Sequence, residues 1–301
     1  MIFLNKVIDF LNSNSVRFEE NVSMKKYTSF KVGGNAKIMV FPENTEQLHS
    51  VVKYLNENSL EPFILGNGSN IVASDEGIEN VVIKLSGDFE NITLLDDTTL
   101  CAGAGVKLSA LCNFALSNEL SGLEFAYGIP GTVGGAAYMN AGAYGGQMSD
   151  VVIKAEHINA DGSKGFYEDK CLGFDYRHSV YSNSDKTITY VIFKLKKGNK
   201  EEILFKMNDF LQRRKDKQPL NFPSAGSVFK RPEGYFAGAL IEQCGLKGKT
   251  IGGAQVSEKH AGFIINIGDA TCQDIKELVR CCQDTVFEKF GVELKCEIKF
   301  I

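Results

Sequence analysis

Apolar residues recur with helical spacing in several separate segments of the chain. In the segment 44–57, Leu48 and Leu55 share one helix face, and Asn44 and Gln47 have the spacing of a capping box. The same periodicity predicts further helices at residues 107–118, 237–244 and 271–290, and another that begins near residue 201. Gly245 and Gly291 are the stop signals of the helices at 237–244 and 271–290.

Short apolar runs between these helices predict strands at residues 62–65, 81–85, 151–158 and 187–195. The last segment, 292–300, alternates apolar and charged residues throughout, which is typical of a half-buried strand. This alternation places Cys296 and Ile298 on one face and Glu297 on the other. The pattern alone leaves Glu297 in solvent. Strands and helices mixed in this order predict an α+β fold.

Length and charge limit the class of protein. A chain of 301 residues, 44% apolar and 23% charged, is typical of a globular protein with two or three domains. Its net charge of −4 argues against nucleic acid as a partner. Residues 201–260 nevertheless hold ten Lys or Arg against seven Asp or Glu. A modest positive surface of this kind suits a small anionic ligand.

The first residues predict a helix rather than a targeting segment. Leu4, Val7 and Leu11 follow helical spacing, while Lys6 and Asp9 interrupt the apolar run that a signal peptide needs. No stretch reaches the apolar length of a membrane span. We therefore expect a cytoplasmic monomer with a small-molecule substrate and no membrane partner.

The eight cysteines do not have the spacing of a metal site or a disulfide framework. There is no Cys-x-x-Cys, and Cys281 and Cys282 are neighbours on a predicted helix, so they point in different directions. Cys112, Cys282 and Cys296 occupy apolar positions of their elements. We interpret them as small buried hydrophobic residues in a reducing compartment, and we expect no metal ion.

Glycine is concentrated in one place. Eight of the thirty glycines lie between Gly122 and Gly146. Glycine allows backbone N–H groups to approach a ligand closely, so this run favours a loop system around a large anion. The alternative, a set of sharp turns between strands, needs only two or three glycines.

A second glycine-containing loop, Gly66–Asn70, directly follows a predicted strand and resembles half of a dinucleotide fingerprint. Ile71 stands in place of the third glycine and no helical pattern follows, which argues against a Rossmann domain. The backbone amides of the loop Gly66–Asn70 could hold a pyrophosphate, although a plain turn is an equal alternative.

Two further residues could carry chemistry. Ser227 lacks the Gly-x-Ser-x-Gly elbow of a hydrolase nucleophile, and His260 is either a ligand or a capped surface residue.

Several fragments together resemble one known family in their order and spacing. These segments are 28–34, 65–70, 128–135, 140–146, 174–179, 224–230 and 253–263, together with the terminal Glu297, so that the similarity runs from about residue 21 to the end. On these segments the chain resembles the UDP-N-acetylenolpyruvoylglucosamine reductases, flavoenzymes of bacterial peptidoglycan precursor synthesis.

The resemblance implies an FAD-binding half made of two subdomains, as in the vanillyl-alcohol oxidase type, followed by an α+β substrate-binding domain. The implied boundaries are residues 1–86, 87–197 and 198–301, and the last strand, with Glu297, would pack back on the FAD half. FAD would be the cofactor and NADPH the co-substrate. The residues implied to bind FAD are Leu65, Gly66, Asn67, Gly68, Ser69, Asn70, Gly128, Pro130, Gly131, Thr132, Gly134, Gly135, Asn140 and Gly142.

The resemblance also implies the chemistry. Arg177 and Glu297 match the positions that stabilise an enolate-like species, and Ser227 matches the family's proton donor. The residues implied to contact the sugar nucleotide are Tyr144, Tyr176, Arg214, Lys217, Lys230, Gln255 and His260.

The chain departs from the family pattern in two places near the substrate. Arg231 stands where many relatives carry Asn, and the short interval from Arg177 to Ser227 resembles the class without a tyrosine loop over the substrate. Two rival functions stay open at this point: an oxidase with the same FAD fold, whose reduced flavin would react mainly with oxygen, and a non-enzymatic nucleotide-binding regulator, which would be colourless.

Overall fold

The computed structural model describes residues 2–301, with side chains from residue 4 onward. The chain forms two compact units. Unit 1 comprises the described residues up to Glu20, with Ile38–Asn67 and Asn80–Gln212, and unit 2 comprises Asn21–Lys37, Gly68–Glu79 and Arg213–Ile301. The three-domain division at residues 86 and 197 stays a prediction.

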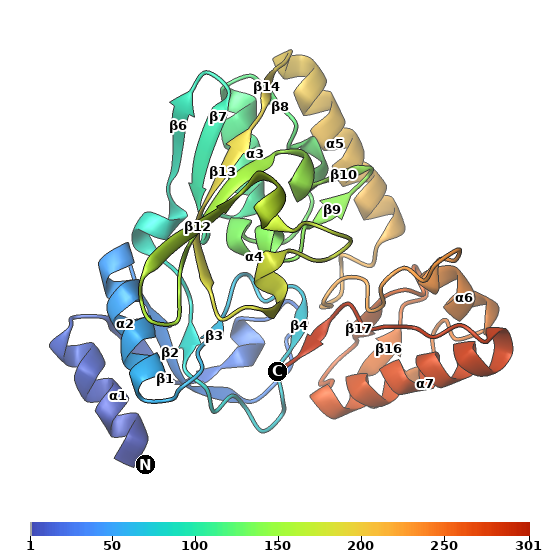
Figure 1. Cartoon of the computed structure of the whole chain (residues 1–301). Coiled ribbons are helices and arrows are strands. Elements are labelled where there is room, and N and C mark those ends of the chain that lie inside the picture. Colours follow the sequence, from blue (N-terminus) through green and yellow to red (C-terminus); the bar gives the residue numbers. More distant parts are fainter. Residues whose placement is uncertain (1) are drawn as a thin grey trace. The chain divides into compact units, whose positions relative to one another are not determined.

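Unit 1 is built on a five-stranded antiparallel sheet with the order β12-β11-β13-β7-β6 (Figure 1). Helix α4 packs against β13 and β7. The sheet strands are β6 (Ile92–Asp96), β7 (Thr99–Gly103), β11 (Val152–Ile158), β12 (Lys164–Glu168) and β13 (Thr187–Lys194), and the helices are α3 (Leu108–Ser117) and α4 (Val133–Tyr138).

The same unit contains short parallel pairings in which β2 and β3 both pair with β5. Two further pairs, β9 with β10 and β8 with β14, are antiparallel. The remaining α-helices and strands of this unit are α1 (Ile2–Ser13), α2 (Thr45–Glu57), β3 (Phe63–Ile64), β5 (Val82–Ile83), β8 (Leu120–Ser121), β9 (Gly142–Ala143), β10 (Gly146–Gln147) and β14 (Lys196–Lys197). Three elements contain residues of both units: β1 (Arg17–Ser23), β2 (Asn35–Phe41) and α5 (Lys200–Lys217).

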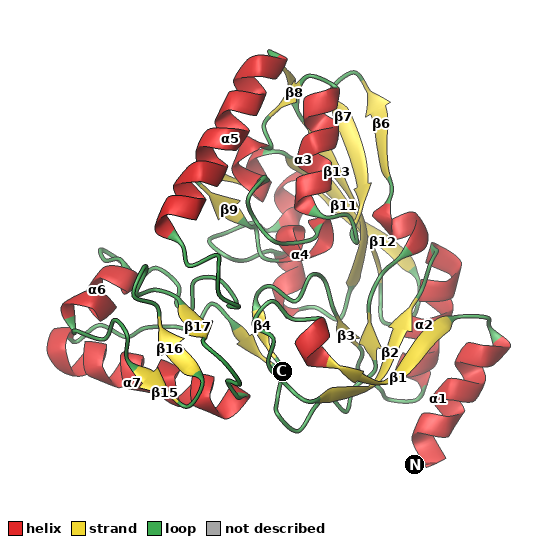
Figure 2. Cartoon of the chain, turned by 180° about the vertical axis from the view of Figure 1, so that it is seen from behind, coloured by secondary structure: helices red, strands yellow, loops and turns green. Residues whose placement is uncertain are grey.

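Unit 2 has a small antiparallel sheet, β15-β16-β17, against which the long helix α7 packs (Figure 2). Its core contains the apolar face of α7, including Ile275, Leu278 and Val286. Strand β4 pairs in parallel with the last strand, β18. The bounds are β4 (Ile71–Val72), β15 (Thr250–Ile251), β16 (Ala254–Val256), β17 (Ile264–Asn266), β18 (Lys299–Phe300), α6 (Ala237–Gln243) and α7 (Cys272–Phe290).

The helices expected from periodicity are confirmed. Asn44 caps α2 by accepting a hydrogen bond from the Gln47 backbone N–H at 2.9 Å, but the Gln47 side chain accepts from Glu43 N instead of completing the box with Asn44. Thr271 and Asp274 form a full capping box at α7, and Gly291 ends that helix with φ of 66°. Within the described part of the chain, no helix has the length and apolar character that crossing a bilayer requires.

The expected nine-residue final strand is wrong. Only Lys299–Phe300 forms a strand, because the preceding backbone pairs irregularly: Lys295 O accepts from Lys230 N, and Glu297 N donates to Val228 O. The alternation of burial survives this loss. Leu294 and Ile298 are buried, whereas Glu297 is half-buried instead of exposed like Lys299.

The cysteine interpretation agrees with the burial of these side chains. All eight cysteines lie in the described part of the chain and none is in a disulfide. Cys112 and Cys282 are buried, and Cys296 is half-buried. The pKa of the Cys112 thiol is raised to about 12, mainly by burial and to a smaller extent by the charge of Glu124. Such a thiol is inert at neutral pH.

The Asp75 side chain caps the start of α7. Its carboxylate accepts hydrogen bonds from Cys272 N at 2.8 Å and from Gln273 N at 3.1 Å. We expect Asp75→Ala to lower the free energy of unfolding by about 1 kcal/mol through the loss of this cap. Chemical denaturation measures the change. The matched control is the exposed neighbour of Asp75, Glu76. The free energy of unfolding of Glu76→Ala should stay within about 0.5 kcal/mol of that of the parent. Equal effects of the two substitutions would contradict the capping role.

Candidate active site

Gly66 and Asn67, from the first of the two segments expected to bind the cofactor, contact the second segment within unit 1. The Asn67 side-chain amide donates to Pro130 O at 2.9 Å. A Cβ on Gly66 would lie 2.8 Å from Thr132 Oγ1, so this close approach requires glycine. The loop after β3 and the glycine-rich run therefore form one continuous surface.

The glycine-rich run contains glycines of two kinds. A Cβ on Gly134 would lie 2.7 Å from Ala104 Cβ and one on Gly146 would lie 2.7 Å from Phe125 Cδ1, so the packing of the chain explains these two. A Cβ on Gly131 or Gly135 would come no nearer than 3.5 Å to any atom apart from its sequence neighbours and its own helix backbone. Internal packing does not require glycine at these two positions, which supports a ligand that approaches the backbone there.

Lys84 belongs to the same surface, and sequence reasoning missed it. Its Nζ donates to Gly66 O at 3.0 Å. The pKa of Lys84 is lowered, mainly by burial. The charge of Glu90 opposes this shift, and the charge of Lys107 adds to it. The only signal in the sequence was a lysine inside the apolar run 81–85.

The arginine expected to act in catalysis lies at the tip of a tight turn. Asp175 and His178 exchange backbone hydrogen bonds of 3.1 and 3.2 Å across Tyr176 and Arg177. The Arg177 Nη2 donates to Gly142 O at 3.3 Å. Thus the turn lies beside the end of the glycine-rich run.

Buried Asn140 holds these two segments together. It is 2% exposed, its Nδ2 donates to Asp175 O at 3.0 Å, and its Oδ1 accepts from Ser149 N at 2.9 Å. The Asn140 amide N–H group thus fixes the arginine turn against the run, and its amide oxygen fixes the backbone at Ser149.

Three residues in this part of unit 1 have a left-handed backbone conformation. Asn140, Tyr144 and Arg177 have φ of 45°, 54° and 53°, in the left-handed region. Asparagine tolerates this region, but a tyrosine or an arginine there costs roughly 1–2 kcal/mol. The Tyr144 ring stacks on Phe210 of α5 with centroids 4.9 Å apart. Strain of this kind is typical of functional sites.

In unit 2, Ser227 and Glu297 lie on neighbouring segments. Ser227 pairs with Phe263, and the next residue, Val228, accepts from Glu297 N at 2.7 Å. Phe229 and Cys296 form a second bridge beside it. The structure thus brings two of the three expected catalytic residues to adjacent backbone positions, with Ser227 exposed and Glu297 half-buried. Arg177 belongs to unit 1.

The remaining expected substrate contacts are spread over unit 2. Arg214 and Lys217 lie in the last turn of α5, and Lys230 follows the Ser227 segment. The Gln255 amide donates to Thr250 Oγ1 at 3.2 Å, so it is engaged within its own hairpin.

His260 has a defined tautomer. Its Nδ1 accepts from Gly262 N at 3.1 Å, so its proton lies on Nε2 when the ring is neutral. Burial is the first cause that lowers the pKa of His260. The imidazole is therefore a neutral donor near pH 7.

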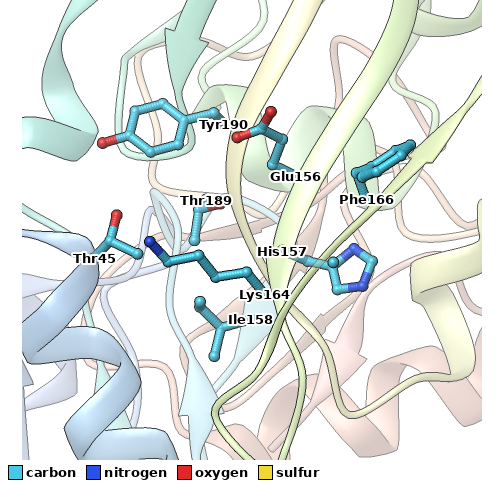
Figure 3. A pocket seen from close by; sticks show the side chains of 9 residues that line it. Thr45, Glu156, His157, Ile158, Lys164, Phe166, Thr189 and Tyr190 are labelled. Carbon is cyan, nitrogen blue, oxygen red and sulfur yellow. The ribbon is translucent and has the colours of Figure 1, made fainter.

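A separate hollow of about 240 Å³ lies in unit 1 beside α2 and the β11–β13 strands (Figure 3). Its lining includes Thr45, Glu156, Lys164 and Tyr190, none of which is an expected site residue. Figure 3 shows the His157 ring turned away from Thr45. His157 Nδ1 is hydrogen-bonded to Tyr181 Oη at 2.9 Å, so it has a structural partner.

Comparisons with known proteins identify first the class and then the family. The FAD binding domain family matches residues 36–164, the region that holds both glycine loops, so the chain is an FAD-binding protein. The C-terminal domain family of UDP-N-acetylenolpyruvoylglucosamine reductase matches residues 218–301. The chain belongs to the UDP-N-acetylenolpyruvoylglucosamine reductase family.

Full-length relatives support this assignment. The reductase of Caldanaerobacter subterraneus subsp. tengcongensis is 47% identical over 100% of this chain and 98% of its own length. That of Clostridioides difficile is 45% identical over 100% and 97%. The crystal structure of the Thermus caldophilus enzyme has a TM-score of 0.81 at 38% identity, covering 95% of this chain and 99% of that one. The expected α+β fold, with an FAD-binding half before the substrate-binding domain, is confirmed.

The open glycine positions give a prediction that separates cofactor binding from folding. A Cβ on Gly131 fits within the protein, so Gly131→Ala should leave the unfolding midpoint of the FAD-free protein nearly unchanged and weaken FAD binding about tenfold or more. Flavin fluorescence titration measures the affinity. Gly134→Ala is the matched control and should destabilise the FAD-free protein through its contact with Ala104. Unaltered FAD affinity in Gly131→Ala would show that no ligand occupies this space.

Proposed function

We propose that this chain reduces UDP-N-acetylglucosamine enolpyruvate to UDP-N-acetylmuramate with NADPH as the reductant. The observation that carries the proposal is the pairing of the Ser227 and Glu297 segments in unit 2. Family membership supports it, because the full-length relatives are named as reductases of this sugar nucleotide.

When bound, FAD would supply the redox chemistry of this reaction, the transfer of a hydride from NADPH to the methylene carbon of the substrate. The chain's own residues manage the charge and the proton. Hydride addition leaves negative charge on the neighbouring carbon, conjugated with the substrate carboxylate. Arg177 and Glu297 would stabilise this charge, and a preorganised donor of this kind is worth roughly 10²–10³ in rate.

Ser227 would complete the reaction by giving its hydroxyl proton to that carbon, so that the enolpyruvyl group becomes a lactyl ether. A positioned general acid contributes about 10²–10⁴ in rate. Glu297 would act protonated or through a bridging cation, because a carboxylate beside the developing anion would repel it.

The cations of unit 2 would bind the diphosphate of the substrate. Arg214, Lys217 and Lys230 are the proposed contacts, and His260 would add a neutral N–H donor. In unit 1, Tyr144 and Tyr176 would line the substrate. Arg231 stacks over Phe236 with its guanidinium carbon 4.0 Å from the ring centroid, so it is held in place although relatives often carry Asn there.

One assay tests the proposed activity directly. The purified yellow protein should oxidise NADPH rapidly when the enolpyruvyl sugar nucleotide is present, and slowly under air without it. Substrate-independent oxidation that consumes oxygen would instead indicate an oxidase. A colourless protein without NADPH turnover would indicate the nucleotide-binding regulator.

The proton-donor role gives a prediction for the separate half-reactions. Ser227→Ala should keep flavin reduction by NADPH within about twofold and slow substrate reduction by roughly 10²–10⁴. Anaerobic stopped-flow absorbance follows both steps. Ser227→Cys, which retains a protonated group, should recover part of the rate. A similar loss in both half-reactions would remove Ser227 from the protonation step.

A further inference from the structure

The loop Gly68–Asn70 is bonded to the segments that carry both Ser227 and Glu297. On the serine side, Ser29 N donates to Gly68 O at 3.0 Å, and Ser29 Oγ donates to Ser224 O at 2.6 Å. This chain of contacts ends three residues before Ser227. All of these residues belong to unit 2.

On the acid side, the link is direct. Asn70 Nδ2 donates to Glu297 O at 3.1 Å. Asn70 O accepts from Lys299 N at 2.9 Å, which begins the pairing of β4 with β18. Ile301 continues this pairing through hydrogen bonds with Val72 and Ser74.

The backbone of Glu297 is thereby held from two sides. Its N–H donates to Val228 O, beside Ser227, and its C=O accepts from the side chain of Asn70. No regular strand fixes this residue, because β18 begins only at Lys299. The Asn70 amide is therefore the contact that fixes the Glu297 carbonyl relative to the loop.

We propose that Asn70 is a positioning residue for Glu297, whose side-chain amide couples the order of the cofactor loop to the placement of the catalytic acid. This inference rests on the proposed function for the role of Glu297. The hydrogen bond itself uses the Asn70 side chain, so its removal leaves the loop backbone in place.

Hydrogen exchange tests the coupling without reference to turnover. In the FAD-loaded enzyme, Asn70→Ala should raise amide exchange in residues 297–301 roughly threefold to tenfold, the range expected for one lost hydrogen bond. Asn70→Asp, which has the same size but no N–H donor, should have the same effect. If instead exchange in this segment equals that of the parent in both variants, the proposed link is wrong.

The half-reactions test the consequence for catalysis. At saturating FAD, Asn70→Ala should lower the maximal rate of substrate reduction about tenfold or more and clearly more than the rate of flavin reduction by NADPH, with little change in substrate affinity. In a Glu297→Gln background the same substitution should cause little further loss, because residues that act as one unit are not additive. Full additivity would show that Asn70 does not act through Glu297.

Asn67 is the matched comparison, because its amide in the same loop donates to Pro130 O instead of the C-terminal segment. Asn67→Ala should alter FAD affinity without changing exchange in residues 297–301. If the parent enzyme does not reduce the sugar nucleotide, the proposed function fails while the exchange experiment still decides the Asn70 link. If the parent is active but the Asn70 variants exchange normally, only the present inference fails.

Discussion

The arrangement of the segments in unit 2 depends on the close approach of the Gly68 backbone to Tyr27 and Thr28. Gly68 has φ of 62°, and a Cβ there would lie 2.0 Å from Tyr27 O. Only glycine allows this contact, and the contact brings Gly68 O to Ser29 N. A side chain at this position would separate the loop from Ser29, and the Ser227 segment would lose its connection to the loop.

Sequence reasoning found the elements whose signal is local. Helix α7 was correctly placed because its periodicity and the glycine stop at Gly291 agree with each other, and the structure adds a capping box at Thr271. The segment 292–300 had an equally regular pattern and still gave a wrong strand. Alternation reports which side chains face the core, and it does so correctly here, but a strand also needs a partner with a matching ladder. The Phe229 segment offers only an irregular one.

The glycine-rich run shows the same limit in another form. Its composition predicted a surface for an anionic ligand, but it could not separate Gly134, where a Cβ would clash with Ala104, from Gly131, where a Cβ would make only ordinary contacts. Side-chain contacts between distant segments were also invisible. Lys84 reaches Gly66, and Asn70 reaches Glu297 across 227 positions of sequence. The lysine inside an apolar run and the asparagine at the end of a glycine loop were visible in the sequence, but their partners were not.

These distant contacts give the loop after β3 a wider role than its sequence suggests. The chain passes from unit 1 to unit 2 between Asn67 and Gly68, inside the loop. On one side, the Asn67 amide fixes the glycine-rich run through Pro130, and on the other, the Asn70 amide fixes the Glu297 carbonyl. A loop that only bound a diphosphate would need its backbone N–H groups and no such amides. Two asparagines three positions apart, each bonded to a different proposed functional segment, therefore indicate that this loop also positions one such segment within each unit.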